Sequence, residues 1–246
     1  MVYVTSDLHG RMDCLEKLLD YVHFDEDEDN WLYILGDVID RNNKGGVDIL
    51  KWLFIQPNVQ LILGNHEQML LSNRWVFQEI NEERIDAIDE KNIGLLSLWE
   101  SNGGGCTMKA LSQETQETRQ DILDYLDDCP LIESVSVGDK NYVLVHSGLG
   151  NYSPSKEMRD YSMDELLWNR PRLGTKYNPD EYIVIFGHTP TSFYAEQFKN
   201  RMIKTDSWRD IDTGAAMEGG RPMLLCLDTG MAYYIEDNGN VIEERN

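Results

Sequence analysis

Four of the five histidines lie in short strings where a strand-like run ends and metal-binding side chains follow. Each run is rich in the β-branched and aromatic residues that favour strands. In an α/β sheet, ligands collect at the carboxyl ends of strands, because several loops converge there on a rigid scaffold. We therefore expect the strings to bring Asp, Asn and His side chains to one edge. They are VYVTSDLHG (2–10), WLYILGDVIDR (31–41), VQLILGNHE (59–67), NYVLVHSG (141–148) and YIVIFGHTP (182–190).

The residue types in these strings suit a pair of divalent transition metals. Imidazole nitrogen together with carboxylate oxygen favours Mn, Fe, Zn or Ni, whereas all-oxygen sites suit Mg and Ca. Asp7 and His9 alternate by two and can reach one ion, and the two oxygens of Asp37 can bridge two ions. The second ion can be completed by Asn65, His146 and His188. Paired metals lie about 3.5–4 Å apart and activate a water near neutral pH, so the pattern predicts a two-metal hydrolase.

The elements that must position these side chains alternate between strands and helices. Segment 68–132 contains no strong strand and is expected to form a helical cap insertion over the site. We expect one α/β domain over residues 1–246, with two packed mixed β-sheets flanked by helices and the metals at one sheet edge. The C-terminal part, 202–236, is strand-rich. Strands are expected at 2–6, 133–138, 142–146 and 182–187, and helices at about 11–22, 68–90, 93–101 and 115–128.

Composition excludes several classes of protein. The net charge of −22, from 44 acidic and 22 basic residues, opposes binding to nucleic acid and to anionic membranes. No apolar run approaches the ~20 residues of a membrane helix, and because the first strand is expected to begin at Val2, we expect no cleavable leader. The four cysteines show no CxxC spacing, so we expect reduced thiols and a cytoplasmic protein. They are Cys14, Cys106, Cys129 and Cys226.

Three other motifs are interpreted as structural. The acidic run 25–29 lacks the Gly and Glu of an EF-hand, since Asn30 and Gly36 stand there, and is expected to be a solvated loop. The glycine run 102–105 does not continue as Gly-Lys-Ser/Thr, so we interpret it as a turn near the metals rather than a P-loop. Two Asp-Thr-Gly triplets, at 212 and 228, are too close together for an aspartic protease and are interpreted as turns.

The series D-x-H-G, G-D-x-x-D-R, G-N-H-E, H-S-G and G-H-T-P resembles the calcineurin-like metallophosphoesterases. More narrowly, it is similar to the serine/threonine phosphoprotein phosphatases, in their bacterial and phage lambda-like branch. The resemblance runs from residue 2 to about residue 236. Further matching stretches are GNHEQM (64–69), SNGGG (101–105), LLWNRPR (166–172) and IDTGA (211–215).

The resemblance implies a role for each matching residue. His66 is implied as the general acid, with Asp40 orienting it, and Arg41 and Arg170 are implied to hold the phosphoryl oxygens beside Asn65 and His66. The implied ligands are Asp7, His9 and Asp37 on one metal, and Asp37, Asn65, His146 and His188 on the other. The implied cofactor is a pair of divalent transition-metal ions, Mn foremost, with Fe, Zn or Ni as alternatives. Arg172, two positions after Arg170, is the alternative phosphate ligand.

Two departures from the family pattern stand beside these matches. Ser6 replaces the usual glycine before the first aspartate, and Asn42-Asn43 replaces the Gly-Pro that usually follows Asp-Arg. Neither change removes a functional side chain. The second leaves open how the loop aims Arg41.

The resemblance implies a metal-dependent phosphomonoesterase that removes phosphate from phosphoserine or phosphothreonine in proteins, by direct attack of a metal-bridging hydroxide. Its expected partners are phosphorylated proteins or peptides, with neither nucleic acid nor membrane. The alternative is a hydrolase of dinucleoside polyphosphates such as diadenosine tetraphosphate. A non-catalytic phosphate-binding scaffold is a third hypothesis, disfavoured because every implied ligand and the general acid are present. Arg41 favours a terminal phosphate, which offers more oxygens to bind.

Overall fold

The computed structural model describes residues 1–42, 44–78, 87–178 and 180–245. Its helices and 3-10 turns are α1 (Met12–Tyr21), η1 (Phe24–Glu26), α2 (Val47–Leu53), α3 (Asn65–Ser72), η2 (Arg74–Phe77), α5 (Glu90–Ser101), α6 (Gly105–Leu111), α7 (Gln116–Asp127), η3 (Met158–Asp160), α8 (Met163–Leu167), η4 (Thr191–Phe193) and η5 (Glu196–Phe198). Its strands are β1 (Val2–Thr5), β2 (Trp31–Ile34), β3 (Val59–Leu61), β4 (Ile132–Val137), β5 (Lys140–Val145), β6 (Ile183–Phe186), β7 (Ile203–Lys204), β8 (Trp208–Asp210), β9 (Met223–Cys226), β10 (Met231–Ile235) and β11 (Val241–Arg245).

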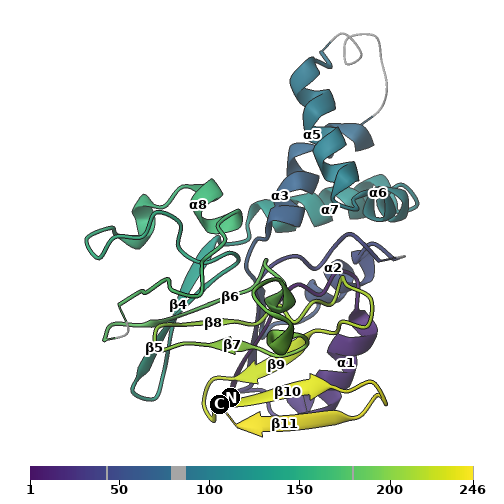
Figure 1. Ribbon diagram of the computed structural model, residues 1–246. Coiled ribbons are helices and arrows are strands. Elements are labelled where there is room, and N and C mark those ends of the chain that lie inside the picture. The colour runs from purple at the N-terminus through teal and green to yellow at the C-terminus, as the bar shows by residue number, and fades with distance from the viewer. Residues whose placement is uncertain (43, 79–86, 179, 246) are drawn as a thin grey trace.

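The strands form two mixed sheets. The first has the order β11-β10-β9-β1-β2-β3, in which β1, β2 and β3 run parallel and the C-terminal strands run antiparallel. The second has the order β4-β5-β6-β8-β7, in which β5, β6 and β8 run parallel. The predicted α/β class with two packed mixed sheets is therefore confirmed, and helices cover the outer face of the first sheet (Figure 1).

Alternation along each strand divides the core into layers, because successive side chains point to opposite faces. In β5, Leu144 packs between the sheets, while Val143 and Val145 pack against the outer segment that includes α8. In β1, Val4 lies between the sheets and Tyr3 lies under the helices. The parallel strands are thus buried on both faces, which explains their continuous apolar runs.

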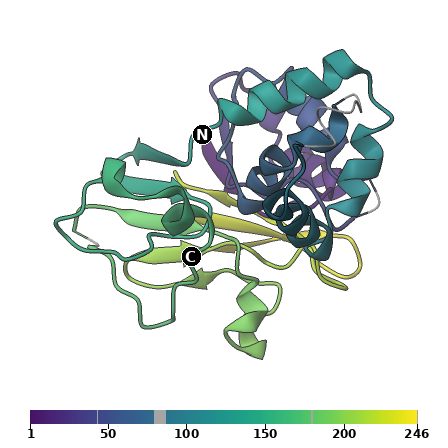
Figure 2. The same ribbon diagram turned by 90° about the horizontal axis from the view of Figure 1, so that it is seen from above.

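The helices of the insertion stand above the two sheets in Figure 1, and in the view from above they lie over the N-terminal part of the chain (Figure 2). Helix α5 matches the helix predicted at 93–101 and α7 the one at 115–128. The helix predicted at 68–90 is confirmed only over 68–72, because α3 ends at Ser72, where Asn73 caps it, and η2 follows. Residues 79–86 of that prediction lie outside the described residues. Helices α2 and α6 were not predicted.

The four cysteines are free, and the acidic run 25–29 is exposed, as expected for a solvated loop. Within the described ranges, no helix combines the length and the apolar character needed to cross a bilayer.

Candidate active site

The five strings meet where the two sheets come together. Asp7 and His9 follow β1, Asp37 follows β2, and Asn65 and His66 open α3 directly after β3. His146 follows β5 and His188 follows β6, so both sheets contribute. These side chains and that of Asp40 are all buried. One pocket is lined by His9, Asp37, Arg41, Asn65, His66, Asn102, Trp168, Arg170, His188, Pro190, Asp212 and Ala216.

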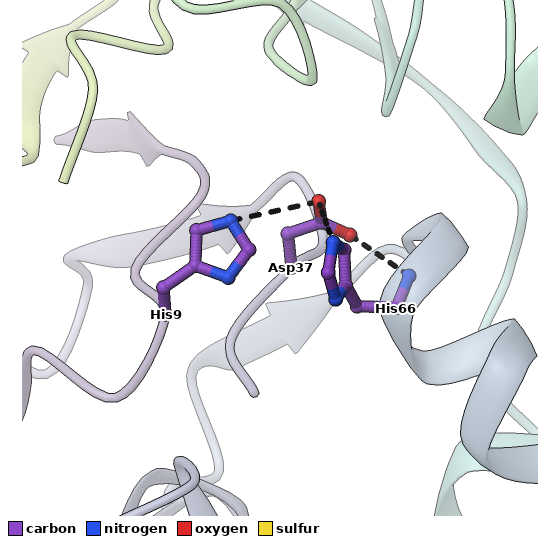
Figure 3. Close-up of side chains that lie close together, drawn as sticks. All are labelled: His9, Asp37 and His66. Atoms are coloured by element: carbon purple, nitrogen blue, oxygen red, sulfur yellow. Dashed lines mark hydrogen bonds and ion pairs between the residues drawn. The ribbon is translucent and has the colours of Figure 1, made fainter. Parts of the chain in front are cut away.

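Asp37 is the centre of the cluster. Its Oδ2 lies 3.8 Å from His9 Nε2 and 3.7 Å from His66 Nε2, and its Oδ1 lies 3.4 Å from His146 Nε2. Figure 3 shows His9 and His66 pointing toward Asp37 from different loops, with His66 at the start of a helix. The backbone N–H of His66 donates to Asp37 Oδ1. One carboxylate thus faces donor nitrogens on two sides, the arrangement that a bridging ligand requires.

The residues on the His146 side of Asp37 fit a cation. His146 Nδ1 lies 2.7 Å from the carbonyl oxygen of Leu35, so Nδ1 carries the proton and Nε2 is left as a lone-pair acceptor. That Nε2 lies 2.9 Å from Asn65 Oδ1, and His188 Nδ1 lies 2.8 Å from the same oxygen. His188 Nε2 is buried without a partner among the described residues. Lone pairs that converge in a buried site suit a bound metal ion.

Two groups of metal-capable side chains result, with all ligand atoms of each group within 4.8 Å of one another. One contains Asp37, His146 and His188, as predicted, and Asn65 adjoins it. The other contains His9 and Asp37 together with His66. The ring of His9 is also fixed in orientation. Its Nδ1 donates to the carbonyl of Ile39 at 2.8 Å, so its Nε2 faces the site.

Asp7 lies at the site in a different setting from the one implied. Its carboxylate accepts the backbone N–H of His188 at 2.9 Å and the hydroxyl of Ser6 at 2.5 Å. It belongs to neither metal-capable group. The close approach depends on Gly187, since a Cβ there would lie 2.0 Å from Asp7 Oδ2. Direct ligation by Asp7 stays a prediction.

Burial favours the neutral form of each titratable ligand candidate in the site. Burial lowers the pKa of His146 to about 3 and the pKa values of His9 and His188 well below their usual range, so these imidazoles are neutral ligands. Burial also raises the pKa values of Asp7 and Asp37 well above their usual range, and the neighbouring carboxylates Asp212 and Glu67 are the next largest causes. Buried carboxylates that repel one another are relieved by divalent cations.

His66 is held by Asp40. His66 Nδ1 lies 2.6 Å from Asp40 Oδ2, which leaves Nε2 facing the pocket. Burial and the charge of Arg41 lower the pKa of His66 to about 3, while burial raises that of Asp40 to about 7. A bound phosphoryl group acts in the opposite sense, because its negative charge favours the protonated imidazole.

The two predicted phosphate-binding arginines reach the same pocket. Arg41 Nη2 lies 3.2 Å from His66 Nε2, and the backbone N–H of Arg41 donates to the carbonyl of Gly103 at 3.2 Å. Arg170 Nη1 donates to Thr189 Oγ1 at 3.0 Å. Arg172 is not among the residues that line the pocket. The geometry therefore favours Arg170 over Arg172, and the insertion loop aims Arg41.

Several residues of the site have left-handed backbone conformations. The φ angles of such non-glycine residues are 50° at Asp7, 42° at His9, 55° at Asp37, 70° at Asp40, 67° at Arg41 and 69° at His188. This region of conformational space is unfavourable for side chains with a Cβ. It turns the chain sharply after β1, β2 and β6, where these residues lie.

Several residues that the structure places at or beside the pocket had no site role in the interpretation of the sequence. Asp212, interpreted only as part of a turn, is buried and lines the pocket. Glu67 accepts the backbone N–H groups of Asp37, Val38 and Gly64, which joins two of the loops. Asn102, from the glycine run, lines the pocket as well. Position directly after a strand was a signal available for Asp212, which follows β8 closely.

Comparisons with known proteins place the chain in a family. Residues 1–213 match the model of the calcineurin-like phosphoesterase family. The chain is 33% identical over 88 residues to a symmetrical bis(5'-nucleosyl)-tetraphosphatase of Pasteurella multocida, covering 35% of this chain and 31% of the relative. It is 41% identical over 79 residues to the enzyme of that name from Actinobacillus succinogenes, covering 32% and 28%. The chain thus spans about a third of the length of these relatives.

Two solved structures share the fold. One is described as a candidate diadenosine tetraphosphatase, with a TM-score of 0.56 and 21% identity over 99% of this chain and 92% of that one. The other is a serine/threonine phosphatase from Saccharomyces cerevisiae with similarity to human phosphatase PP5, with a TM-score of 0.55 and 16% identity over 99% and 78%. At these identities the likeness shows the fold alone. The family match over residues 1–213 shows that the chain belongs to the calcineurin-like phosphoesterase family, and the His/Asp groups of its site could hold metal ions.

Proposed function

We propose that this chain hydrolyses dinucleoside polyphosphates, with diadenosine tetraphosphate as the representative substrate. The observation that carries the proposal is the similarity, at 33% and 41% identity, to relatives named symmetrical bis(5'-nucleosyl)-tetraphosphatases. This was the alternative hypothesis from the sequence, and the relatives support it better than they support a protein phosphatase.

The chain's own residues supply binding and proton transfer. Arg41 and Arg170 approach the pocket from different loops, and their guanidinium groups can bind phosphoryl oxygens and the charge that grows there during reaction. His66 Nε2 faces the pocket and can protonate the leaving oxygen, while Asp40 fixes the other ring nitrogen. Two divalent ions held by His9, Asp37, Asn65, His146 and His188 would activate water and polarise the phosphoryl group.

A second candidate is the removal of phosphate from phosphoserine or phosphothreonine. The segment that carries Arg170 also presents exposed acidic side chains, Asp160 and Asp164, and the whole chain has a net charge of −22. Such a surface repels a tetraphosphate and attracts basic residues beside a phosphosite. Among the residues that line the pocket, Trp168 is the one aromatic residue, and its ring packs edge-on to His188. This supports an open site that takes a phosphorylated loop.

The test compares kcat/KM for diadenosine tetraphosphate with kcat/KM for a phosphopeptide with flanking arginines, using manganese-loaded protein. We expect the dinucleotide to be favoured by at least tenfold, with two molecules of ADP as the products. A tenfold preference for the phosphopeptide, fading as salt screens the acidic surface, would instead establish the second candidate. ATP and AMP as products would contradict symmetrical cleavage.

A further inference from the structure

Besides His66, two side chains of the helical insertion hold the carboxylate of Asp40. Asp40 is fully buried, and its Oδ2 accepts both His66 Nδ1 at 2.6 Å and the indole Nε1–H of Trp99 at 2.9 Å. Its Oδ1 accepts the hydroxyl of Thr107 at 2.5 Å. The backbone N–H of Asp40 in turn donates to Thr107 Oγ1 at 3.0 Å. Three donors therefore fix the plane of one carboxylate.

Both outer donors come from segments distant in sequence. Trp99 lies in α5 and Thr107 in α6, 59 and 67 positions from Asp40, and both are fully buried. The apolar ring of Trp99 packs within the main core under the helices. Side chains that are packed in this way cannot rotate freely, so their donors stay aimed at Asp40.

The glycine run between α5 and α6 allows this approach. A Cβ on Gly104 would lie 2.4 Å from the ring of Trp99, and a Cβ on Gly103 would lie 2.9 Å from Arg41 Cγ. Gly103 also has a φ of 97°, which other residues rarely adopt. The carbonyl of Gly103 accepts the backbone N–H of Arg41. The run brings the insertion against both the Asp40–His66 pair and the phosphate-binding arginine.

We propose that Trp99 and Thr107 are positioning residues for the general acid, so that the helical insertion is part of the catalytic apparatus and not only a cover. The proposal rests on the phosphoester hydrolysis proposed above and holds for either substrate class. In the step concerned, a water oxygen forms a bond to phosphorus, and the bond to the leaving oxygen breaks. The electron pair of that bond goes to the leaving oxygen, which takes the proton of His66 Nε2. The proton of the attacking water passes to solvent and later restores His66.

The geometry explains why an Asp40 side chain that is free to rotate would slow this step. Proton transfer requires His66 Nε2 within hydrogen-bond reach of the leaving oxygen, and an error of about 1 Å can cost 10²-fold in rate. Without Thr107 or Trp99, Asp40 can rotate, and the His66 ring rotates with it. The loss falls on substrates whose leaving oxygen needs the proton.

The test uses variants that remove one donor and keep the shape. Thr107→Val removes the hydroxyl, Thr107→Ser keeps it, and Trp99→Phe removes the indole N–H. Trp75→Phe is the matched control, because Trp75 lies in the same insertion and its buried Nε1 has no partner among the described residues. Each protein is assayed on an alkyl phosphate, with a poor leaving group, and on p-nitrophenyl phosphate, with a good one.

We expect Thr107→Val and Trp99→Phe to lower kcat for the alkyl phosphate by about 10–100-fold, with KM little changed. The loss on p-nitrophenyl phosphate should stay below about threefold. Thr107→Ser and Trp75→Phe should behave like the wild type. Equal losses on both substrates, or no rescue by serine, would show a merely structural role and overturn the proposal.

A second readout does not depend on activity. We expect the proton on His66 Nδ1, hydrogen-bonded to Asp40 at 2.6 Å, to give a downfield proton resonance in NMR, identified by its absence in His66→Asn. Thr107→Val and Trp99→Phe should shift or broaden this resonance, whereas Trp75→Phe should leave it in place. An unchanged resonance in both donor variants contradicts the proposal even if the wild type hydrolyses no ester. Hydrolysis of aryl phosphates but not of the dinucleotide would overturn only the substrate assignment.

Discussion

At the scale of single residues, His66 is the group whose chemistry is most sharply defined. Its Nδ1 is hydrogen-bonded to Asp40, and its Nε2 faces the pocket. We expect His66→Asn to lower kcat by about 10²–10⁴-fold, the usual contribution of a general acid. The loss should be smallest for aryl phosphates, whose leaving groups need no proton, and metal content should change little. Equal losses for aryl phosphates and phosphoserine would instead assign His66 to positioning or to the metal group in which it lies.

A pair of neighbouring arginines tests the phosphate contact. Arg170 lines the pocket and donates to Thr189, whereas Arg172 is exposed and does not line it. We expect Arg170→Ala to raise KM and lower kcat, because a guanidinium binds the phosphoryl oxygens in the ground state and more strongly in the transition state. Arg172→Ala is the control and should match the wild type in steady-state kinetics. If Arg172→Ala lost activity while Arg170→Ala matched the wild type, the phosphate-binding role would belong to Arg172.

At the scale of elements, the segment before Arg170 is organised around one carboxylate. Glu165, in α8, accepts Lys156 Nζ at 2.7 Å, the N–H of Ser162 at 2.9 Å and Asn151 Nδ2 at 2.9 Å. The bond from Lys156 is the largest of the causes that lower the pKa of Glu165 to about 2. This pKa lies below the pKa of a glutamate in the unfolded chain, which is about 4.3. Ionised Glu165 therefore stabilises the folded state fully at pH values above about 4.3. This stabilisation is lost as the pH falls through about 2.

We therefore expect Glu165→Gln to lower the melting temperature at pH 7, and the difference from wild type to shrink toward pH 2. Glu157→Gln is the control on the same segment, since Glu157 forms an exposed ion pair with Arg159, and such pairs contribute little. Thermal unfolding followed by circular dichroism at several pH values measures both. Equal shifts for the two variants, or a difference that does not change with pH, would contradict the role given to Glu165.

The elements also show what the sequence could predict. Asp7, His9, Asp37 and the residues of the later strings were predictable, because each lies within a few positions of the strand that places it. Thr107 and Trp99 were not, since their contacts with Asp40 cross 67 and 59 positions and neither residue type indicates chemistry. The end of α3 at Ser72 was not predicted, because the mixture of polar and apolar residues typical of a helix continues beyond it.

At the scale of the whole molecule, the metal-capable groups join the two sheets. Asp37 follows β2 of the first sheet, whereas His146 and His188 follow β5 and β6 of the second. A ligand that binds only the folded state stabilises it, by about 2.7 kcal/mol at 100 times its Kd. We expect chelation to abolish activity and lower the melting temperature, and Mn²⁺ to restore both best, as the mixed nitrogen and oxygen donors favour transition metals. Full turnover by protein verified as metal-free would contradict this mechanism.

The left-handed backbone at six site residues has a consequence for the history and engineering of this chain. Each such residue is strained by roughly 1–2 kcal/mol relative to a glycine at the same position. Glycine at Asp40 or Arg41 would therefore relax the turn while removing the chemistry. If variants were selected for thermal stability alone, with no requirement for activity, we expect substitutions to glycine at these site residues before substitutions in the core. The six turns thus carry a cost in stability at the site, which glycine would remove only together with the side chains that the turns position.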